Sequence, residues 1–438
     1  MDYTIEEVLQ FIEENDVRFV RLTFCDMFGY PKNIAVPASR LGHIFRHGVS
    51  FDASVVDGFM NVEETDLFLH PDPVTLAVLP WRPQQGRVVR LFCDIKYPDG
   101  RPFEGDGRYL LKQAVAHAAA RGCSCRMGAE CEFYLFQCDD DGNPTKVPHD
   151  KAGCFDIAPL DKAENIRREI CLTLDEMGIW TSESHHKHGP GQNEISFISC
   201  DALNAADNFF TFKSVAKTVA SLNGLFASFL PRPLAGCSGS GMHLNMYLAK
   251  DGVSIFNTKP EKRGKEADCF IAGILDHIRD ITAFLNPIPN SYERFGSFEA
   301  PRYITWSLQN RSQLIRIPDT TGEEYRAELR SPDMSCNPYF AIALILYAGI
   351  DGIERGLKLP EPADFNHERI SEFLSDTARL PADLGEAVSL ARESDFLARI
   401  MPQNTLKKYL DAKQREWEEY ASADDLTDYF DKRYFSVI

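Results

Sequence analysis

The order of hydrophobic and polar positions predicts two regions of different character. An amphipathic helix at residues 4–14 is followed by two short strands that meet at residues 28–31, and strand-like runs follow at 75–80 and 87–95. The stretch YPDGRPFEGDGR, residues 97–108, is rich in Gly and Pro and predicts a boundary. We therefore expect a sheet-rich N-terminal domain at residues 1–103 and a larger domain at residues 104–438.

Helices and strands alternate after this boundary. Residues 107–122 have a helical pattern that ends at Gly122, and a long helix is expected from about 205 to 230, before Pro231. Asp161 with Glu164 matches a capping box for a helix at 162–177. Strands are expected in AECEFYLF, SGMHLNMYL and EYRAELR, and mostly helices from about residue 337 onward, among them LPADLGEAVSLARES and TLKKYLDAKQREWEEYA.

Composition narrows the class of protein. The chain has 438 residues, of which 44% are hydrophobic and 26% charged, as is usual for a globular protein. The net charge of −18 argues against nucleic acid or an anionic membrane as the main partner. The N-terminus lacks the pattern of a secretion signal, no apolar run is long enough to span a bilayer, and the twelve cysteines are scattered. We expect reduced thiols and a cytoplasmic location.

Candidate chemistry lies on four of the predicted strands. Residues i and i+2 of a strand point to the same face. The charged and polar side chains so placed are Glu130 and Glu132, Glu194, His243 and Asn245, and Arg326, Glu328 and Arg330. One such pair is most simply a solvated sheet face, but four strands of this kind favour a site. Glu and His are ligands that suit Mg²⁺ or Mn²⁺, and arginines among them suggest a metal–phosphate site.

The usual nucleotide-binding loops are missing from the sequence. There is no GxxxxGK[ST] and no GxGxxG pattern. The glycine-rich GCSGSG, residues 236–241, precedes a strand pattern rather than a helix. Any ATP is therefore expected to bind by a different arrangement.

Several longer segments carry a family resemblance. They are FDASVVDGF (51–59), GAECEFYLF (128–136), SHHKHGPGQNEISF (184–197), GSGMHLN (239–245), NPIPNSYERFGSFEAP (286–301), NRSQLIRIP (310–318) and RAELRSPD (326–333). Together they resemble the glutamine synthetase family, in its bacterial type I form, over essentially the whole chain. The resemblance implies an α+β fold, with a β-grasp N-terminal domain and a catalytic domain of antiparallel sheet with flanking helices.

The resemblance also implies an activity and an assembly. In this family ATP phosphorylates the side-chain carboxylate of glutamate, ammonia attacks the acyl phosphate, and Mg²⁺ or Mn²⁺ neutralises the phosphates. The family forms a dodecamer of two stacked hexamers, whose active sites are shared between neighbouring subunits. The partners implied for this chain are therefore ATP, glutamate or an analogue, ammonia or an amine, and further copies of itself.

The resemblance assigns roles to individual residues. Metal ligands are Glu132 and Glu194 on the glutamate side and Glu130, His243 and Glu328 on the ATP side. Glutamate would contact Arg294, Arg330 and Gly239, and ATP would contact Arg316, Arg326 and Asn245. The catalytic residues would be Asp52 from a neighbouring subunit, which helps to deprotonate ammonium, Glu299, which closes over the intermediate, and Arg311, which steadies the transferring phosphoryl group.

The sequence departs from the family at two positions of one pocket. Lys187 stands where the family pattern has a third glutamate ligand of the glutamate-side metal, and Cys154 stands where it has a tyrosine near the ammonium site. An ammonium about 4 Å from a dication is repelled by roughly 8 kcal/mol at an effective dielectric constant near 20. Lys187 therefore either replaces that metal by pairing Glu132 and Glu194, or turns away to solvent.

Two functions follow from this pattern. One is an ATP-dependent ligase that joins the γ-carboxylate of glutamate, or of an analogue, to ammonia or another amine. The complete set of arginines and ATP-side ligands favours this function. The other is a catalytically impaired regulatory or ligand-sensing protein, which the changes at Lys187 and Cys154 favour.

Overall fold

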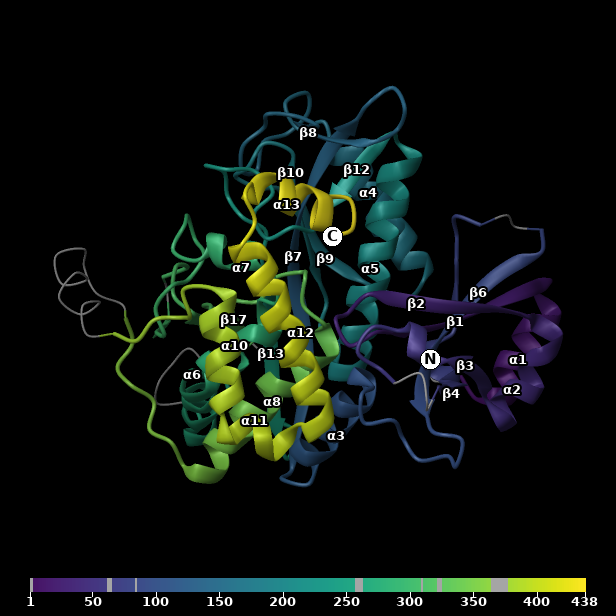
Figure 1. The fold of residues 1–438 in the computed structure, drawn as a ribbon, viewed down its shortest axis with the longest axis horizontal. Coiled ribbons are helices and arrows are strands. Elements are labelled where there is room, and N and C mark those ends of the chain that lie inside the picture. Colours follow the sequence, from purple (N-terminus) through teal and green to yellow (C-terminus); the bar gives the residue numbers. More distant parts are fainter. Residues whose placement is uncertain are drawn as a thin grey trace.

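The computed structural model describes residues 3–60, 65–82, 85–256, 263–308, 310–320, 325–363 and 377–438. Helices and two sheets make up the chain, as the α+β expectation requires (Figure 1). Among these residues no helix is long and apolar enough to cross a membrane. The division at residues 103 and 104 stays a prediction.

The N-terminal region is a small sheet flanked by α1 (Ile5–Glu14) and α2 (Leu41–His47). Its strand order is β2-β1-β6-β4-β3, with β5 on β6, and β1 runs parallel to β6. The bounds are β1 (Val17–Cys25), β2 (Pro31–Pro37), β3 (Val49–Asp52), β4 (Asp66–Pro71), β5 (Ala77–Val78) and β6 (Arg87–Lys96). The strand expected at 75–80 is largely wrong, because Asp72 caps a short 3₁₀ turn that starts at Pro73 and leaves only β5 extended.

The larger region is built on a second sheet whose central strand is β7 (Cys123–Cys138). The order is β15-β16-β17-β13-β7-β10-β9, and β8, β11, β12 and β14 pair at its sides. The remaining bounds are β8 (Pro144–Pro148), β9 (Thr181–His186), β10 (Gln192–Phe197), β11 (Cys200–Asp201), β12 (Leu225–Ser228), β13 (Met242–Lys250), β14 (Val253–Ser254), β15 (Trp306–Ser307), β16 (Ile315–Arg316) and β17 (Ala327–Leu329).

Helices pack on this sheet and form the C-terminal part of the chain (Figure 1). Their bounds are α3 (Gly107–Ala119), α4 (Glu164–Glu176), α5 (Ala202–Leu222), α6 (Lys265–Leu285), α7 (Pro289–Arg294), α8 (Pro338–Arg355), α10 (Leu384–Glu393), α11 (Asp395–Ile400), α12 (Gln403–Ala421) and α13 (Leu426–Phe430). The mostly helical C-terminal part is confirmed in the described residues.

Two of the expected helix ends are wrong. The helix expected to reach residue 230 ends at Leu222, because Gly224 takes a left-handed φ of 70° and β12 then pairs with β7. Asp161 does not cap α4, which starts at Glu164 after Ala163. The Asp161 carboxylate instead accepts the Ala163 N–H and pairs with the buried Arg167.

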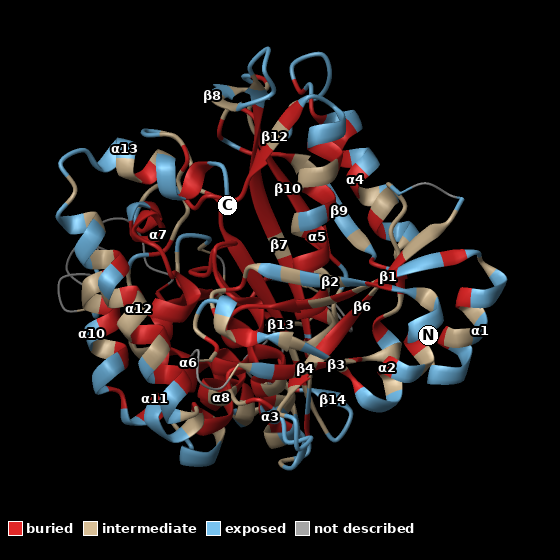
Figure 2. Ribbon diagram, turned by 45° about the vertical axis from the view of Figure 1, so that its right-hand side comes forward, coloured by how far each residue is buried: buried red, intermediate tan, exposed pale blue. Residues whose placement is uncertain are grey.

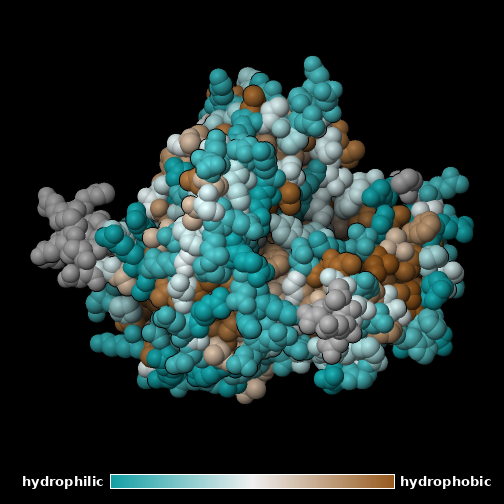
Figure 3. Space-filling view, in the orientation of Figure 1, coloured by the Kyte–Doolittle hydropathy of each residue, from teal (hydrophilic) through white to brown (hydrophobic). Residues whose placement is uncertain are grey.

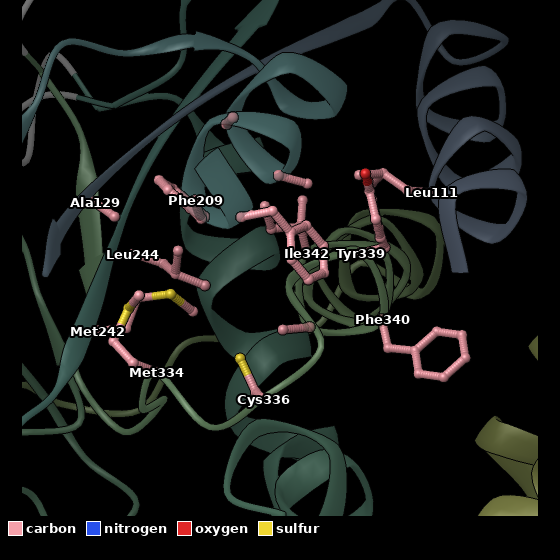
Figure 4. Close-up of a cluster of buried hydrophobic side chains, with 14 of the residues drawn as sticks. Leu111, Ala129, Phe209, Met242, Leu244, Met334, Cys336, Tyr339, Phe340 and Ile342 are labelled. Atoms are coloured by element: carbon pink, nitrogen blue, oxygen red, sulfur yellow. The ribbon is translucent and has the colours of Figure 1, made fainter. Parts of the chain in front are cut away.

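Strand alternation separates the core from the opposite face of the sheet. Ala129 of β7 and Leu244 of β13 are fully buried, and they face a cluster that includes Phe209 of α5 and Ile342 of α8 (Figure 4). Figure 2 shows β7 and β13 buried along most of their length. Glu130 follows Ala129 in β7 and His243 precedes Leu244 in β13, so both side chains point to the opposite face of the sheet.

A buried ion pair joins three C-terminal helices. His277 Nε2 of α6 lies 2.8 Å from Asp351 Oδ2 of α8, and the His277 ring stacks on Phe396 of α11 with centroids 3.8 Å apart. Burial alone would lower the pKa of His277, but hydrogen bonds with Asp280 and Asp351 outweigh it and raise the pKa. The pair therefore contributes most stability below the unfolded histidine pKa of about 6.5, and this part is lost as pH rises through the raised pKa.

We expect Asp351→Asn to lower the thermal midpoint more at about pH 5.5 than at about pH 8.5. The reason is that the Asp351 carboxylate stabilises the His277 ring more strongly when that ring is charged. The additional loss in the free energy of unfolding at about pH 5.5 should be about 1–3 kcal/mol. Differential scanning fluorimetry at both pH values measures it. Asp411→Asn, which removes the exposed partner of Arg392, is the control and should show no such difference. Equal losses at both pH values for Asp351→Asn would contradict this account.

Candidate active site

The register of the large sheet gathers the strand residues expected to form a site. Glu130 of β7 lies directly opposite His243 of β13, and Glu132 of β7 lies opposite Glu194 of β10. Further along, Asn245 lies opposite Glu328 of β17, which in turn pairs with Arg316 of β16. Directly opposed residues of antiparallel strands share a face. All these side chains therefore lie on the face of the sheet opposite the apolar core.

Glu130, His243 and Glu328 offer ligand atoms that all lie within 4.8 Å of one another. His243 Nδ1 lies 3.2 Å from Glu130 Oε2 and 3.5 Å from Glu328 Oε1. Burial alone would raise the pKa of Glu130, but its hydrogen bond with His243 lowers it well below its usual range. Within the described part of the chain this is the one group of three such ligands, and its carboxylate and imidazole donors fit Mg²⁺ or Mn²⁺.

Arginines border this group of ligands. Glu328 pairs with Arg330 and, at 3.3 Å, with Arg316 Nη1. The Arg326 Nε–H donates to Asn245 Oδ1 over 2.9 Å. Guanidinium groups held in this way present their remaining N–H donors to a negatively charged ligand.

Arg294 is buried and fixed by two backbone carbonyls. Its Nη1 donates to Ser331 O and its Nη2 to Arg330 O, each over 2.7 Å. A Cβ at Gly239 would lie 2.8 Å from Arg294 Cγ and 2.5 Å from Pro231 O, so only glycine fits there. A small pocket is lined by Arg294, Gly239, Arg330, Glu299, Glu132, Lys187 and His188, among others. The structure thus brings the residues expected to bind glutamate into one pocket.

Lys187 points into the site rather than to solvent. Its Nζ lies 2.9 Å from Glu132 Oε1 and 2.9 Å from Glu194 Oε2, and the residue is only 8% exposed. The other oxygen of Glu132 accepts the Gly241 N–H over 2.6 Å. The ammonium therefore occupies the space between the two carboxylates.

The loop after β9 fixes the backbone of Lys187. The Lys187 N–H donates to Gln192 O over 2.8 Å, and the Gly191 N–H donates to Asp150 Oδ1 over 3.0 Å. Asp150 also lies 2.9 Å from His186 Nε2. Burial would raise the pKa of Asp150, but the bond with His186 lowers it to about 2. Sequence reasoning missed Asp150, because it lies 36 residues before His186 in the chain and no local pattern links them.

The charges between β7, β9 and β10 are only partly balanced. Burial opposes the charge of Lys187, but Glu132 and Glu194 outweigh it and raise the lysine pKa. Burial likewise opposes the charge of Glu132, yet Lys187 lowers its pKa to about 2. Burial and the charge of Glu132 raise the pKa of Glu194 to about 8 despite Lys187. The Lys187 ammonium therefore balances Glu132, and Glu194 ionises only where a further positive charge lowers its pKa.

Cys154 lies beside the same pocket. Burial raises the pKa of its thiol, and the charges of Lys187, Glu194 and Glu299 all act on it. The next residue, Phe155, has a φ of 63° and places its ring 4.7 Å from the His185 ring. Both departures from the family pattern therefore meet at one place in the structure.

Three of the expected site residues are less tightly placed. Glu299 Oε2 lies 3.7 Å from Arg330 Nη2 and its side chain is 42% exposed. Arg311 is exposed in the turn between β15 and β16. Asp52 is exposed on β3 of the N-terminal sheet, where its carboxylate accepts hydrogen bonds from Ser54 N–H and Oγ–H over 2.9 and 2.6 Å. Within this chain Asp52 caps its own turn.

We expect Lys187→Met to destabilise the protein by about 3–5 kcal/mol in metal-free buffer, because it leaves two buried carboxylates without a cation. Adding Glu194→Gln should recover much of this loss by removing the repulsion. Chemical denaturation of the single and double variants measures both effects. Lys146→Met, which removes the partly exposed partner of Asp431, is the control and should cost about 1 kcal/mol or less. A Lys187→Met variant as stable as this control would show that the ion pairs are unimportant.

Comparison with known proteins supports the interpretation of this geometry. Residues 16–98 match the family model of the glutamine synthetase beta-grasp domain, and residues 104–429 match that of the glutamine synthetase catalytic domain. The glutamine synthetase of Methanosarcina mazei is 46% identical over 423 residues, 95% of each chain. That of Clostridium saccharobutylicum is 44% identical and covers 95% of this chain and 96% of its own. The β-grasp expectation is thereby confirmed.

Solved structures share the fold of this chain. The GmaS/ADP complex in conformation 1 superposes with a TM-score of 0.87 at 30% identity and covers 99% of both chains. The Plasmodium falciparum glutamine synthetase superposes with a TM-score of 0.88 at 24% identity over 98% of this chain and 99% of its own, a likeness of fold alone. The two domain matches and the close relatives show that the chain belongs to the glutamine synthetase family, the ATP-dependent glutamate–ammonia ligases.

Proposed function

We propose that this protein joins the γ-carboxylate of glutamate, or of a close analogue, to ammonia or another amine through an acyl phosphate, with one divalent ion and with Lys187 in the place of a second. The observation that carries this proposal is the position of the Lys187 ammonium, 2.9 Å from both Glu132 and Glu194. The twelve cysteines, all free, support a reducing cytoplasm as its location.

The ATP side of the site uses the residues of three neighbouring strands. Glu130, His243 and Glu328 would hold Mg²⁺ or Mn²⁺, which when bound neutralises phosphate charge. Arg316, Arg326 and Asn245 would orient the nucleotide, and Arg311 would approach the transferring phosphoryl group from its exposed turn. Support also comes from the GmaS structure, which was solved with ADP.

The glutamate side depends on groups that are already fixed. Arg294 and Arg330 would bind the carboxylates of the amino acid, and Gly239, whose missing Cβ leaves room for the Arg294 side chain, would contact it through its backbone. The two bonds from Arg294 to backbone carbonyls hold its guanidinium before substrate arrives, so little ordering remains to be done on binding. Glu299, half exposed beside Arg330, would cover the reacting carboxylate.

The amine would enter beside Lys187 and Cys154. A protonated amine beside Glu194 would lower the raised pKa of that carboxyl and pair with it as it ionises. Cys154 is smaller than the tyrosine of the family pattern and leaves more room at this position. Because Lys187 stands where the family pattern has a glutamate, the pocket lacks one carboxylate that would hold ammonium. We therefore propose that it accepts amines larger than ammonia.

The two departures from the family pattern favour a second function. Because Lys187 and Cys154 both alter the ammonium pocket, a sensor that binds glutamate or nucleotide without turnover is the alternative. The intact arginines and the converging ATP-side ligands favour the ligase. The presence or absence of amine-dependent ADP release separates the two.

We expect ADP release that requires both glutamate and an amine, measured with ammonia, methylamine, ethylamine and a no-amine control. Lys187→Glu combined with Cys154→Tyr should shift the preference toward ammonia over methylamine by about tenfold or more, which corresponds to about 1.4 kcal/mol in transition-state binding. Lys146→Met serves as a surface control. ADP release that no amine stimulates would favour the sensor, and an unchanged preference in the double variant would remove Lys187 and Cys154 from amine selection.

We also propose that the working form is a ring-based oligomer, most simply a dodecamer. Asp52 is turned to solvent in its own chain, so its expected role requires a neighbouring copy. Exposed apolar side chains of the same domain, including Phe19 and Val55, offer surface for such a contact, and Figure 3 shows a group of hydrophobic side chains over this region. Mass photometry should find the oligomer, and only monomers at micromolar concentration would contradict this proposal.

A further inference from the structure

A second cleft lies between the N-terminal sheet and helix α5, and shares no lining residue with the pocket around Lys187. Its volume is about 330 Å³, and its walls carry four cationic side chains: Arg21, Lys32, Arg82 and Arg90. Trp81 and Phe92 add aromatic surface. No acidic side chain lines this cleft in the described part of the chain, although the whole protein has a net charge of −18.

The β1–β6 pairing forces two of these cations together. Arg21 of β1 and Arg90 of β6 are register partners in the parallel pair, and they lie on the face of the strands opposite the buried Val20 and Val89. Like charges placed side by side on a sheet destabilise it. The fold therefore keeps a repulsion here that a bound anion would relieve.

The hydrogen bonds of these arginines leave donors free. The Arg21 Nη1–H donates to Asn33 Oδ1 and the Arg90 Nη1–H donates to Thr211 Oγ1, each over 3.0 Å, and both acceptors are neutral. The Nε of Arg90 is buried and has no hydrogen-bond partner among the described residues. Burial lowers the pKa of Arg90 to about 10. Lys32, by contrast, has an acid partner outside the cleft, because its Nζ lies 3.2 Å from Asp26.

We propose that this cleft binds a small polyanion, a metabolite that carries two or more phosphate or carboxylate groups. Arg21, Arg90 and Arg82 pair its charges, since guanidinium forks match both kinds of group. Phe92, whose ring centroid lies 4.0 Å from the Arg90 guanidinium carbon, keeps that group in place, and Trp81 covers the less polar part of the ligand.

The position of the cleft links such a ligand to the catalytic sheet. Thr211 belongs to α5, and Phe212, the next residue of this helix, packs against Phe133 of β7 with ring centroids 5.8 Å apart. Phe133 follows Glu132 directly in β7. A polyanion held between Arg21, Arg90 and Thr211 ties the N-terminal sheet to the helix that supports the site.

Isothermal titration of the whole protein in metal-free buffer with pyrophosphate, citrate and acetate tests this proposal. We expect saturable binding of pyrophosphate or citrate with one site per chain, and none of acetate. Whichever of pyrophosphate and citrate binds more tightly shows whether the cleft prefers phosphate or carboxylate groups. Arg90→Gln and Arg21→Gln should each weaken binding about tenfold or more, since each removes charge-assisted hydrogen bonds.

Three further variants keep the test decisive. Arg82→Gln, at an exposed position, should weaken binding without affecting folding, so a poorly folded Arg90 variant cannot hide the result. Arg46→Gln on α2 is the matched control outside the cleft, and Arg316→Gln reports any binding at the catalytic face. The absence of saturable binding would overturn the proposal. Binding that is lost in Arg316→Gln but kept in Arg90→Gln would also overturn it, because the ligand would then bind at the catalytic face. A third contrary result is that the Arg21 and Arg90 variants lose the oligomer while ligand binding is unchanged.

Discussion

The register of β7 against β10 and β13 is the constraint on which the site depends. It places Glu132 opposite Glu194 and Glu130 opposite His243, while Ala129 and Leu244 face the core between α5 and α8. A slip of one residue would turn the carboxylates into that core and expose the apolar set. The hydrophobic packing that stabilises the sheet therefore also determines which side chains meet on its other face.

Lys187 changes what this arrangement can do. Buried carboxylates repel one another unless a cation lies between them, and a metal ion or an ammonium can fill that role. Here the cation belongs to the chain itself, is held at 2.9 Å from both partners, and has its backbone fixed through Gln192. On the ATP side, the ligand atoms of Glu130, His243 and Glu328 all lie within 4.8 Å of one another. The site thus combines one group suited to a divalent ion with one that is closed by a fixed positive charge.

Much of this could be predicted from the sequence, and the limits have physical causes. Alternation of side chains along strands placed Glu130 with Glu132 and His243 with Asn245, because that period is local. The end of α5 was misplaced because Gly224 and the pairing of β12 with β7 outweigh a continuous helical pattern. Asp150 was missed because its contacts with His186 and Gly191 join distant parts of the chain. The direction of the Lys187 side chain was left open by the sequence, since both orientations fit the same pattern.

The number of divalent ions bound per chain tests the central claim most directly. Mn²⁺ titration followed by electron paramagnetic resonance, in the presence of nucleotide, counts these ions without relying on activity. The account predicts one ion for the wild type, two for Lys187→Glu, and loss of the wild-type ion in Glu328→Ala. A wild-type protein that binds two ions with similar affinity would contradict the account, because it would show that Lys187 leaves the space between Glu132 and Glu194 to a metal.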